Sequence, residues 1–529
     1  MKSTASAAAC LAAALLSCAL SGPSLAQERI TVTTPLGGLS GIATQNAEQF
    51  LGIPFAQPPV GALRWAPPQP AMGWSGEKDA SQSAASCPQN GGSAAIAAAK
   101  SEDCLYLNVF RPIGADEGAA LPVMVYAYGG GNAGGGAVEQ NGARLASETG
   151  VIVVVPNYRL GALGFLNLTA FDAGGASAAG GNYGVLDLEA ALEWVQGNIA
   201  AFNGDPTRVT LASQSSGATN TCRLLVDPDA AGLYAAAILS SDDCVRDVDT
   251  IAQSQSRAEK LAEDLGCSGT PDVVACLRAK SADELLTGGG GWNPNATRPA
   301  RDLIFAGEWN KVPVLLGSTR EEGRSAGIAY TGFDADDYER WIERLVSPAY
   351  GELVKSAYGL EASGEAYELP YRIGAFITDS GMRGLGGCPN YALARHIAAQ
   401  APVFYYQFED RNPPAWQGPE GYRMLASHGL DVQYLWSAPE DFAAPDAKFS
   451  AAQAQLADEM VRYWGAFVRN HDPAVPGQAA WPRLATTDGS MLALRPGGDS
   501  QAVAAASFAA QHRCEIWDIV PEILDRGEI

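Results

Sequence analysis

Short apolar runs of three to six residues recur through the chain and alternate with longer segments of helical periodicity. Val123–Ala127 and Val151–Val155 are rich in β-formers and bounded by Gly or Pro, which is typical of buried parallel strands. Further strands are predicted at Val209–Ala212, Ala237–Ser240, Val314–Leu316 and Val403–Phe408, and helices at Asp187–Ala200 and Ala218–Leu225. This alternation predicts an α/β fold, with a mostly parallel sheet covered by helices on both faces. In such sheets the functional site lies at the carboxyl ends of the strands.

The chain has 529 residues and no Pro/Ser-rich linker, charge block or long repeat, so we expect residues 27–529 to form one large domain. Residues 1–26 are predicted to be a signal peptide, because Lys2 precedes an Ala/Leu-rich run and Ser24-Leu25-Ala26 suits signal peptidase. The run is short for a bilayer span, which needs about 20 residues, so no stable membrane insertion is expected. We expect a secreted or periplasmic protein. Lipid anchoring at Cys18 is the alternative, because Leu15–Cys18 loosely resembles a lipobox.

Cysteine number and net charge limit the partners of this chain. Eight cysteines follow the leader, an even number that suggests disulfides in an exported protein. There is no CxxC pair and there are only four histidines, so no metal site is predicted. The formal net charge of −23 argues against nucleic acid and anionic membranes as partners. Nothing in the sequence indicates the oligomeric state.

A serine-rich turn follows the strand predicted at Val209–Ala212 and reads Ser213-Gln214-Ser215-Ser216-Gly217. A strand–turn–helix elbow holds its central residue in a strained conformation above the sheet, and it needs very small residues two positions before and after that residue. Ser215 has Ser213 and Gly217 at these positions, whereas centring the turn on Ser216 or Ser213 would place Gln or Leu there. Sterics therefore select Ser215 as a candidate nucleophile. By itself the stretch is also compatible with an ordinary loop.

A glycine-rich segment, Tyr128-Gly129-Gly130-Gly131, directly follows the strand predicted at Val123–Ala127. Consecutive glycines let the backbone approach a ligand closely and aim N–H groups at it. We assign the N–H groups of Gly130 and Gly131, with that of Ser216, to a candidate oxyanion hole, in which losing one donor typically costs about 3 kcal/mol. A flexible turn is the alternative. A phosphate loop is disfavoured, because no Gly-Lys-Ser/Thr follows.

A candidate base and a candidate acid complete the chemistry that a serine nucleophile needs. His428 lies in a loop beside Gly429 and is the favoured base, but the other histidines remain open on the residues alone: His396, His471 and His512. In chain order the acid is expected between the serine and the histidine. Glu321 and Glu322 both follow the strand predicted at Val314–Leu316.

Several segments together resemble the type-B carboxylesterase/cholinesterase family. They occur in the family's order and span about Ile30 to Trp517: LGIPFAQPPVGALRW (51–65), SEDCLYLNVFRP (101–112), NYRLGALGFL (157–166), GNYGVLDLEAALEWVQGNIAAFNGDPTRVTLASQSSG (181–217), GSTREEG (317–323), SHGLDVQYLW (427–436) and WPRL (481–484). The resemblance implies an α/β-hydrolase fold. It also implies a serine hydrolase that cleaves small carboxylic esters through an acyl-serine intermediate, without a metal or organic cofactor.

The resemblance assigns His428 as the base and Glu322, rather than Glu321, as the acid. It also implies that two pairs of charged residues are structural rather than catalytic, Arg64 with Glu102 and Arg159 with Asp187. An amidase or lactonase that uses the same triad is the alternative function. Adhesion-type family members that lack the nucleophile are a more distant alternative, because all three triad positions are filled here.

Three disulfides are implied by the same resemblance: Cys87–Cys104, Cys267–Cys276 and Cys388–Cys514. Cys222 and Cys244 remain, either as a fourth bridge or as two buried thiols. The segment between the first two cysteines, Pro88 to Asp103, occupies the place of the lid of fat-hydrolysing relatives. Its only apolar stretch is Ala94–Ala99, in which Ile96 is the one bulky side chain. We therefore expect an esterase that is not activated at lipid interfaces.

Four positions depart from the family pattern around the candidate site. Ser213 replaces a glycine, Gln214 an acidic residue and Ser216 an alanine, and Asn132 stands where an aromatic residue is usual. Asn132 and Gln214 are therefore the candidate substrate-binding residues, and they favour a polar or carboxylate-bearing ester over a cationic choline ester. Alternatively, both side chains satisfy local backbone groups.

Overall fold

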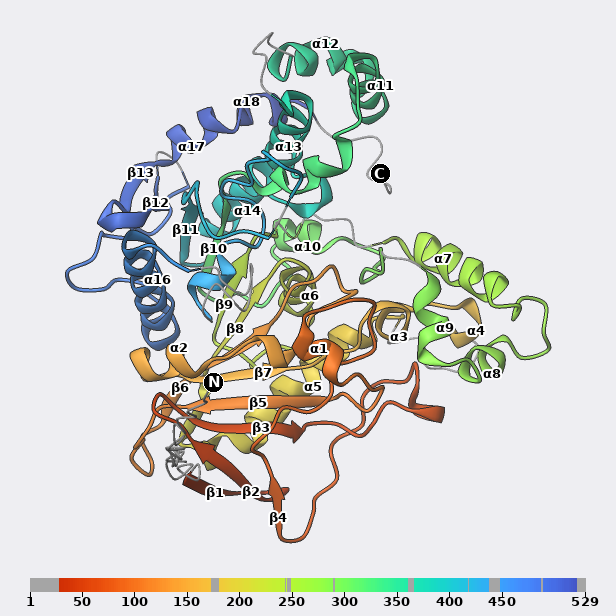
Figure 1. The fold of residues 1–529 in the computed structure, drawn as a ribbon, viewed down its shortest axis with the longest axis vertical. Coiled ribbons are helices and arrows are strands. Elements are labelled where there is room, and N and C mark those ends of the chain that lie inside the picture. Colours follow the sequence, from red (N-terminus) through yellow and green to blue (C-terminus); the bar gives the residue numbers. More distant parts are fainter. Residues whose placement is uncertain are drawn as a thin grey trace, which may run out of the picture.

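The computed structural model describes residues 28–172, 180–242, 244, 249–288, 291–359, 366–416, 418–436, 448–486 and 489–520 (Figure 1). The predicted signal peptide and Cys18 lie outside the described residues. Within the described ranges, no helix is long and apolar enough to cross a membrane.

One large sheet runs through the molecule, from β1, β2 and β4 at the bottom of Figure 1 to β13 at the upper left. Its order is β1-β2-β3-β5-β7-β6-β8-β9-β10-β11-β12-β13, and β4 pairs with β2. The strands are β1 Glu28–Thr34, β2 Gly37–Ala43, β3 Glu48–Pro54, β4 Glu77–Asp79, β5 Tyr106–Arg111, β6 Leu121–Ala127, β7 Ile152–Pro156, β8 Gly204–Gln214, β9 Ala236–Ser240, β10 Val314–Thr319, β11 Val403–Phe408, β12 Ser490–Leu494 and β13 Gln501–Ala504. Every neighbouring pair from β7 to β12 is parallel, as predicted.

The six strands predicted from apolar runs are β6 to β11, and they form the centre of this sheet. The predicted apolar runs in these strands are buried because helices cover both faces, whereas the first half of β8 is partly exposed. The antiparallel strands at the two ends of the sheet were not predicted from the sequence. These end strands carry exposed and half-buried positions, so they lack the continuous apolar run that marks a buried strand.

Helices pack on both faces of the parallel centre. On one face, α2 (Ala143–Thr149) contacts β5 and β7, and α16 (Ala451–Asn470) contacts β6 and β8. The opposite face is covered by α5 (Tyr183–Asn198), α6 (Ser216–Leu225), α10 (Ala300–Ala306) and α14 (Cys388–Ala398). Short helices lie in the connections: α1 Ala94–Ala98, α3 Gly161–Phe165, α4 Thr169–Asp172, α17 Ala505–Gln511 and α18 Cys514–Trp517. This arrangement is an α/β-hydrolase fold.

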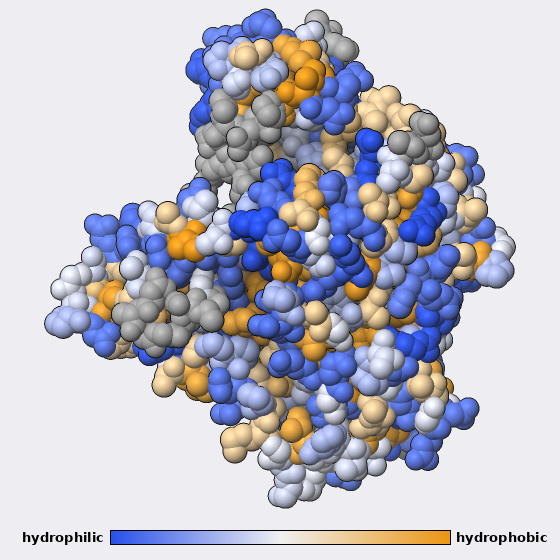
Figure 2. All heavy atoms as spheres, turned by 180° about the vertical axis from the view of Figure 1, so that it is seen from behind, coloured by the Kyte–Doolittle hydropathy of each residue, from blue (hydrophilic) through white to orange (hydrophobic). Residues whose placement is uncertain are grey.

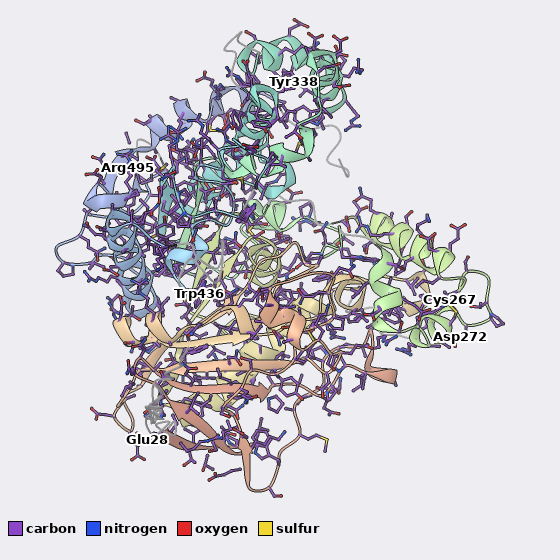
Figure 3. The ribbon with its side chains drawn as sticks, viewed as in Figure 1. Glu28, Cys267, Asp272, Tyr338, Trp436 and Arg495 are labelled. Atoms are coloured by element: carbon purple, nitrogen blue, oxygen red, sulfur yellow. A yellow bond between two sulfur atoms is a disulfide. The ribbon has the colours of Figure 1, made fainter. Side chains whose placement is uncertain are left out.

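Two helical lobes project from the sheet (Figure 1). The first contains α7 (Ile251–Asp264), α8 (Val273–Arg278) and α9 (Ala282–Leu285), and Cys267 is labelled in it in Figure 3. The second contains α11 (Ala335–Leu345), α12 (Pro348–Ala357) and α13 (Glu368–Ser380), and it includes Tyr338 in the same view. The second lobe has a small apolar core of its own, to which Trp341 and Phe376 contribute. Its helix α13 packs against the segment that follows β10.

Four disulfides connect these elements. The three pairs expected from the family resemblance are present, and Cys222 pairs with Cys244. This fourth bridge ties α6 to the loop after β9, so the alternative of two free thiols is wrong in this structure. The expected ion pairs are also present, with Arg159 Nε 2.8 Å from Asp187 Oδ2 and Arg64 Nε 2.7 Å from Glu102 Oε2.

The face of the molecule drawn in Figure 2 is largely hydrophilic. Apolar residues are scattered over it, singly and in small groups, among charged and polar ones. The large apolar side chains that are exposed come from separate elements: Val60, Met72, Ile113, Ile251, Phe305, Leu353 and Ile519. Single exposed apolar residues of this kind are usual and need no partner.

Candidate active site

Ser215 occupies a sharp turn between β8 and α6. Its backbone has φ 54° and ψ −130°, a combination that costs a non-glycine residue energy and is typical of strained functional positions. Its N–H donates to Ser240 O in β9 at 2.9 Å, and its carbonyl accepts from Ala218 N and Thr219 N in the first turn of α6. The neighbouring strand and helix therefore hold the strained turn, and the Ser215 side chain is half-buried.

The residues flanking the nucleophile position explain why the turn can form. A Cβ on Gly217 would overlap the backbone carbonyl oxygens of Ala127 and Tyr128, so only glycine fits there. Ser213 is buried, and its Oγ donates to Ile238 O at 3.0 Å. A serine is tolerated at this position because its hydroxyl finds a backbone acceptor.

Ser215, His428 and Glu322 are joined by a chain of hydrogen-bond contacts. His428 Nε2 lies 2.8 Å from Ser215 Oγ, and His428 Nδ1 lies 2.6 Å from Glu322 Oε2. The other carboxylate oxygen of Glu322 accepts from Thr319 N at 2.7 Å, which fixes the carboxylate. From the carboxylate to the imidazole the exposed fraction of the side chain rises: Glu322 is fully buried, and the His428 side chain is 20% exposed. The three residues follow β8, β10 and β11, so they meet at the carboxyl edge of the sheet.

The alternative acid and bases lie elsewhere. Glu321 pairs with Arg411 at 2.8 Å and accepts from Ala426 N. His396 Nε2 contacts a backbone carbonyl, and His471 ends α16. His512 forms a second buried histidine–carboxylate pair, with Nδ1 2.7 Å from Asp379 Oδ1, but its Nε2 faces Gln407 rather than a hydroxyl.

The glycine segment after β6 borders the serine. A Cβ on Gly129 would lie 2.9 Å from Ser215 Cβ, so only glycine lets the backbone pass this close to Ser215. Gly130 and Gly131 have positive φ and are exposed. Their N–H groups, like that of Ser216, donate to no acceptor within the described part of the chain. The amide groups of Gly130 and Gly131 are therefore unpaired among the described residues, one and two positions beyond the glycine that borders Ser215.

The two candidate substrate-binding residues are both buried, but their side chains have different partners. Asn132 is fully buried, and its Oδ1 accepts from Asn220 Nδ2 at 2.9 Å, so its side chain ties the glycine segment to α6. Gln214 is also largely buried, but its Nε2 lies 3.5 Å from His428 Nε2. Of the two, only Gln214 has a side chain beside the reacting groups.

One buried carboxylate in the His428 loop was not among the residues predicted from the sequence. Asp431 follows His428 by three residues and is 3% exposed. Burial, together with the negative charge of Glu322, raises the pKa of Asp431 to about 6, while positive charge on His428 acts in the opposite direction. The sequence does contain one indication of this buried acid. Asp431 lies between two apolar residues, Leu430 and Val432, in the segment SHGLDVQYLW.

No group of three or more metal-binding side chains occurs in the described ranges. The groups that are present suit acyl transfer. A hydroxyl faces an imidazole, a buried carboxylate contacts the other nitrogen of that imidazole, and a glycine segment passes close to the serine. The fold and these groups define a serine hydrolase of the α/β-hydrolase class.

Comparison with known proteins narrows this class. The carboxylesterase family matches residues 28–517, and the chain belongs to that family. It is 32% identical to a cocaine esterase of Homo sapiens over 486 residues, 84% of each chain. It is 31% identical to a fumonisin B1 esterase of Sphingopyxis macrogoltabida over 85% of this chain and 84% of that protein. It is 31% identical to carboxylesterase 1D of Rattus norvegicus over 88% of this chain and 87% of that one. The protein is a carboxylic ester hydrolase.

Proposed function

We propose that Ser215, His428 and Glu322 are the catalytic triad of this ester hydrolase. The observation that carries the proposal is the pair of contacts at His428, 2.8 Å to Ser215 Oγ and 2.6 Å to Glu322 Oε2. Ser215 Oγ attacks the ester carbonyl while His428 Nε2 takes its proton. His428 then protonates the leaving alcohol, and an acyl-serine remains. Water activated by His428 attacks this acyl group and releases the acid.

Glu322 and the glycine segment have separate roles in this mechanism. Glu322 holds the proton on Nδ1 of His428, leaves Nε2 free to accept, and stabilises the imidazolium that forms. The N–H groups of Gly130, Gly131 and Ser216 bind the oxygen on which negative charge develops. Support for the second role comes from the close approach of Gly129 to Ser215, and from the absence of acceptors for these N–H groups among the described residues.

Two neighbouring serines provide a test of the triad. Ser215→Ala should lower turnover by about a millionfold, whereas Ser216→Ala should retain much of the activity because its N–H remains. An organophosphonate probe followed by peptide mapping should label Ser215 alone. Labelling of Ser213 or Ser216 in place of Ser215 would show that the turn has been assigned wrongly.

The natural substrate is proposed only as a class. The similar proteins are named for several different esters, so their names do not select one. We propose a soluble ester, with amide or lactone cleavage as the alternative, since the same groups serve both reactions. Rates on ester and amide pairs that share acyl and leaving groups distinguish the two. Faster cleavage of the amides would make the protein an amidase.

Export from the cytoplasm is a further part of the proposal. It is supported by four disulfides, which form and persist in oxidising compartments. N-terminal sequencing of the protein recovered from periplasm or medium should begin at Gln27. A mature N-terminus at a lipid-modified Cys18 would instead establish the lipoprotein alternative.

A further inference from the structure

Three consecutive residues after β6 have positive φ, and the last of them is not a glycine. The values are 123° at Gly130, 65° at Gly131 and 55° at Asn132. Glycine adopts such values freely, and asparagine is among the few other residues that adopt the left-handed region at low cost. Asn132 therefore continues the turn that the two glycines begin, and it adds a side chain that can be held in place.

The side chain of Asn132 is held inside the protein by a second asparagine. Asn220 Nδ2 donates to Asn132 Oδ1 at 2.9 Å, and both residues are fully buried. The backbone of Asn132 is held as well, because its carbonyl oxygen accepts from Gly161 N at 2.6 Å, at the start of α3. A residue with no exposed surface does not bind substrate directly, so the role of Asn132 must be sought in these contacts.

Asn220 lies on the helix that carries Ser216, the third candidate donor of the oxyanion hole. The two residues are four positions apart in α6, so their side chains lie on the same face of the helix, one turn apart. The glycine segment also meets α6 at its other end, where a Cβ on Gly217 would overlap the carbonyl oxygens of Ala127 and Tyr128. One helix therefore contacts the segment on both sides of its three glycines, by close packing before them and by the asparagine pair after them.

The asparagine pair adds little to the stability of the fold. Asn132 Nδ2 and Asn220 Oδ1 are buried and have no hydrogen-bond partner among the described residues. A buried polar atom without a partner costs at least as much as a typical hydrogen bond contributes, so the two unpaired atoms offset the bond between the side chains. This balance favours a role in positioning over a role in stability.

We propose that Asn132 and Asn220 are positioning residues of the oxyanion hole. The buried amide pair fixes the distance between the glycine segment and α6, and so makes the N–H groups of Gly130, Gly131 and Ser216 converge on one oxygen. The inference rests on the proposed triad and oxyanion hole. Without the pair, the far end of the segment is tied to α3 alone, and glycines, which restrict the backbone least, pass that freedom on to the donors. Neither asparagine touches the substrate or a transferred proton.

The test is Asn220→Leu, which keeps the approximate size of the side chain and removes the donor. We expect kcat to fall about tenfold with KM unchanged, less than the hundredfold or more that deletion of a donor costs, because the hole acts on the charge of the transition state. Binding of an aryl trifluoromethyl ketone, which forms a charged adduct with the nucleophilic serine, should weaken by the same factor. Thr221→Val is the matched control, since it removes a buried hydroxyl from the next position of α6, and it should change neither value.

Asn132→Gly is the second variant, and it remains informative if Asn220→Leu does not fold. Glycine keeps the positive φ and removes the side chain, so the same losses of kcat and of ketone affinity are expected. The double variant should lose no more than either single variant, because both substitutions remove one contact. Losses that add in the double variant would refute the proposal, as would unchanged kcat and ketone affinity in both single variants.

A purely structural role, or an error in the proposed site, would give a different result. A lower melting temperature in either variant, with kcat and ketone affinity at the wild-type level, would show that the pair only stabilises the fold. A wild-type protein that does not bind the ketone would refute the oxyanion hole. An active Ser215→Ala variant would refute the triad itself.

Discussion

Gly217 and Gly197 are both helical glycines, but their surroundings differ. A Cβ at Gly217 would meet two backbone carbonyl oxygens at the end of β6, which cannot yield without moving the glycine segment. Gly217→Ala should therefore lower kcat/KM by about a hundredfold or more and reduce the melting temperature. In α5, a Cβ at Gly197 meets nothing, and Gly197→Ala should stabilise the protein by about 0.5–1 kcal/mol. Esterase assays and thermal unfolding check both variants, and full activity of Gly217→Ala would contradict the steric argument.

Gln214 directly precedes Ser215, so the identity of this residue sets the charge beside the proposed nucleophile. Its amide lies 3.5 Å from His428 Nε2, so a carboxylate here would add negative charge beside the bound alcohol group. Gln214→Glu should raise the preference for a choline ester over its neutral 3,3-dimethylbutyl isostere about tenfold, roughly 1.4 kcal/mol. The measurement is the ratio of kcat/KM for the two esters. If the wild-type protein already prefers the choline ester, the predicted selectivity for polar or carboxylate-bearing esters is wrong.

At the level of elements, the segment between Cys87 and Cys104 is attached to the site and does not form a free flap. Gln89 accepts from Gly135 N at 2.9 Å and donates to Gly135 O at 2.8 Å. The same segment contains the short helix α1. The side chain of Ile96, its one bulky apolar residue, is completely buried. The segment therefore offers almost no apolar area to a lipid surface.

From this segment we predict that the rate of ester hydrolysis does not rise when a lipid interface forms. Burial of apolar area contributes about 25 cal/mol per Å², and the exposed side chains of α1 are alanines, which supply little area. The rate on a short triglyceride should follow the dissolved concentration and level off at the solubility limit. A sharp rise in rate as droplets form would show interfacial activation and place the enzyme with the lipases.

At the scale of the whole molecule, the Cys388–Cys514 bridge connects α14 beside the central sheet to the C-terminal helix α18. The bridge spans 126 residues, whereas Cys267–Cys276 closes a loop of 9 within one lobe. Replacing both cysteines of a bridge by alanine removes its loop-closure entropy from the unfolded state. We expect the free energy of unfolding to fall by about 5 kcal/mol for the long bridge and by about 2.5 kcal/mol for the short one. Denaturant unfolding of the two double variants measures the difference. Equal losses would mean that local packing, and not chain entropy, sets the contribution of these bridges.

The local patterns of the sequence determined the central strands and the nucleophile turn. β6 to β11 were predictable because a strand buried on both faces must be apolar at every position, and Ser215 because only small residues fit on either side of the turn. The resemblance to a known family supplied what local pattern left open, namely the choice of His428 over three other histidines and of Glu322 over Glu321. The antiparallel end strands were missed because a strand with one exposed face has a weaker signal than a buried one.

Only the tertiary structure decided the electrostatics of the site. Exposure of a side chain depends on residues that are distant in sequence, and so does the charge around it. Asn132 is therefore buried against Asn220, and Asp431 lies near Glu322, His428 and Tyr406, from separate parts of the chain. Neither placement has a local pattern, because a polar residue in a loop looks the same in sequence whether it faces water, substrate or a second carboxylate. Residue spacing determined which strands carry the chemistry, and the packing of those strands and helices decided which side chains take part in it.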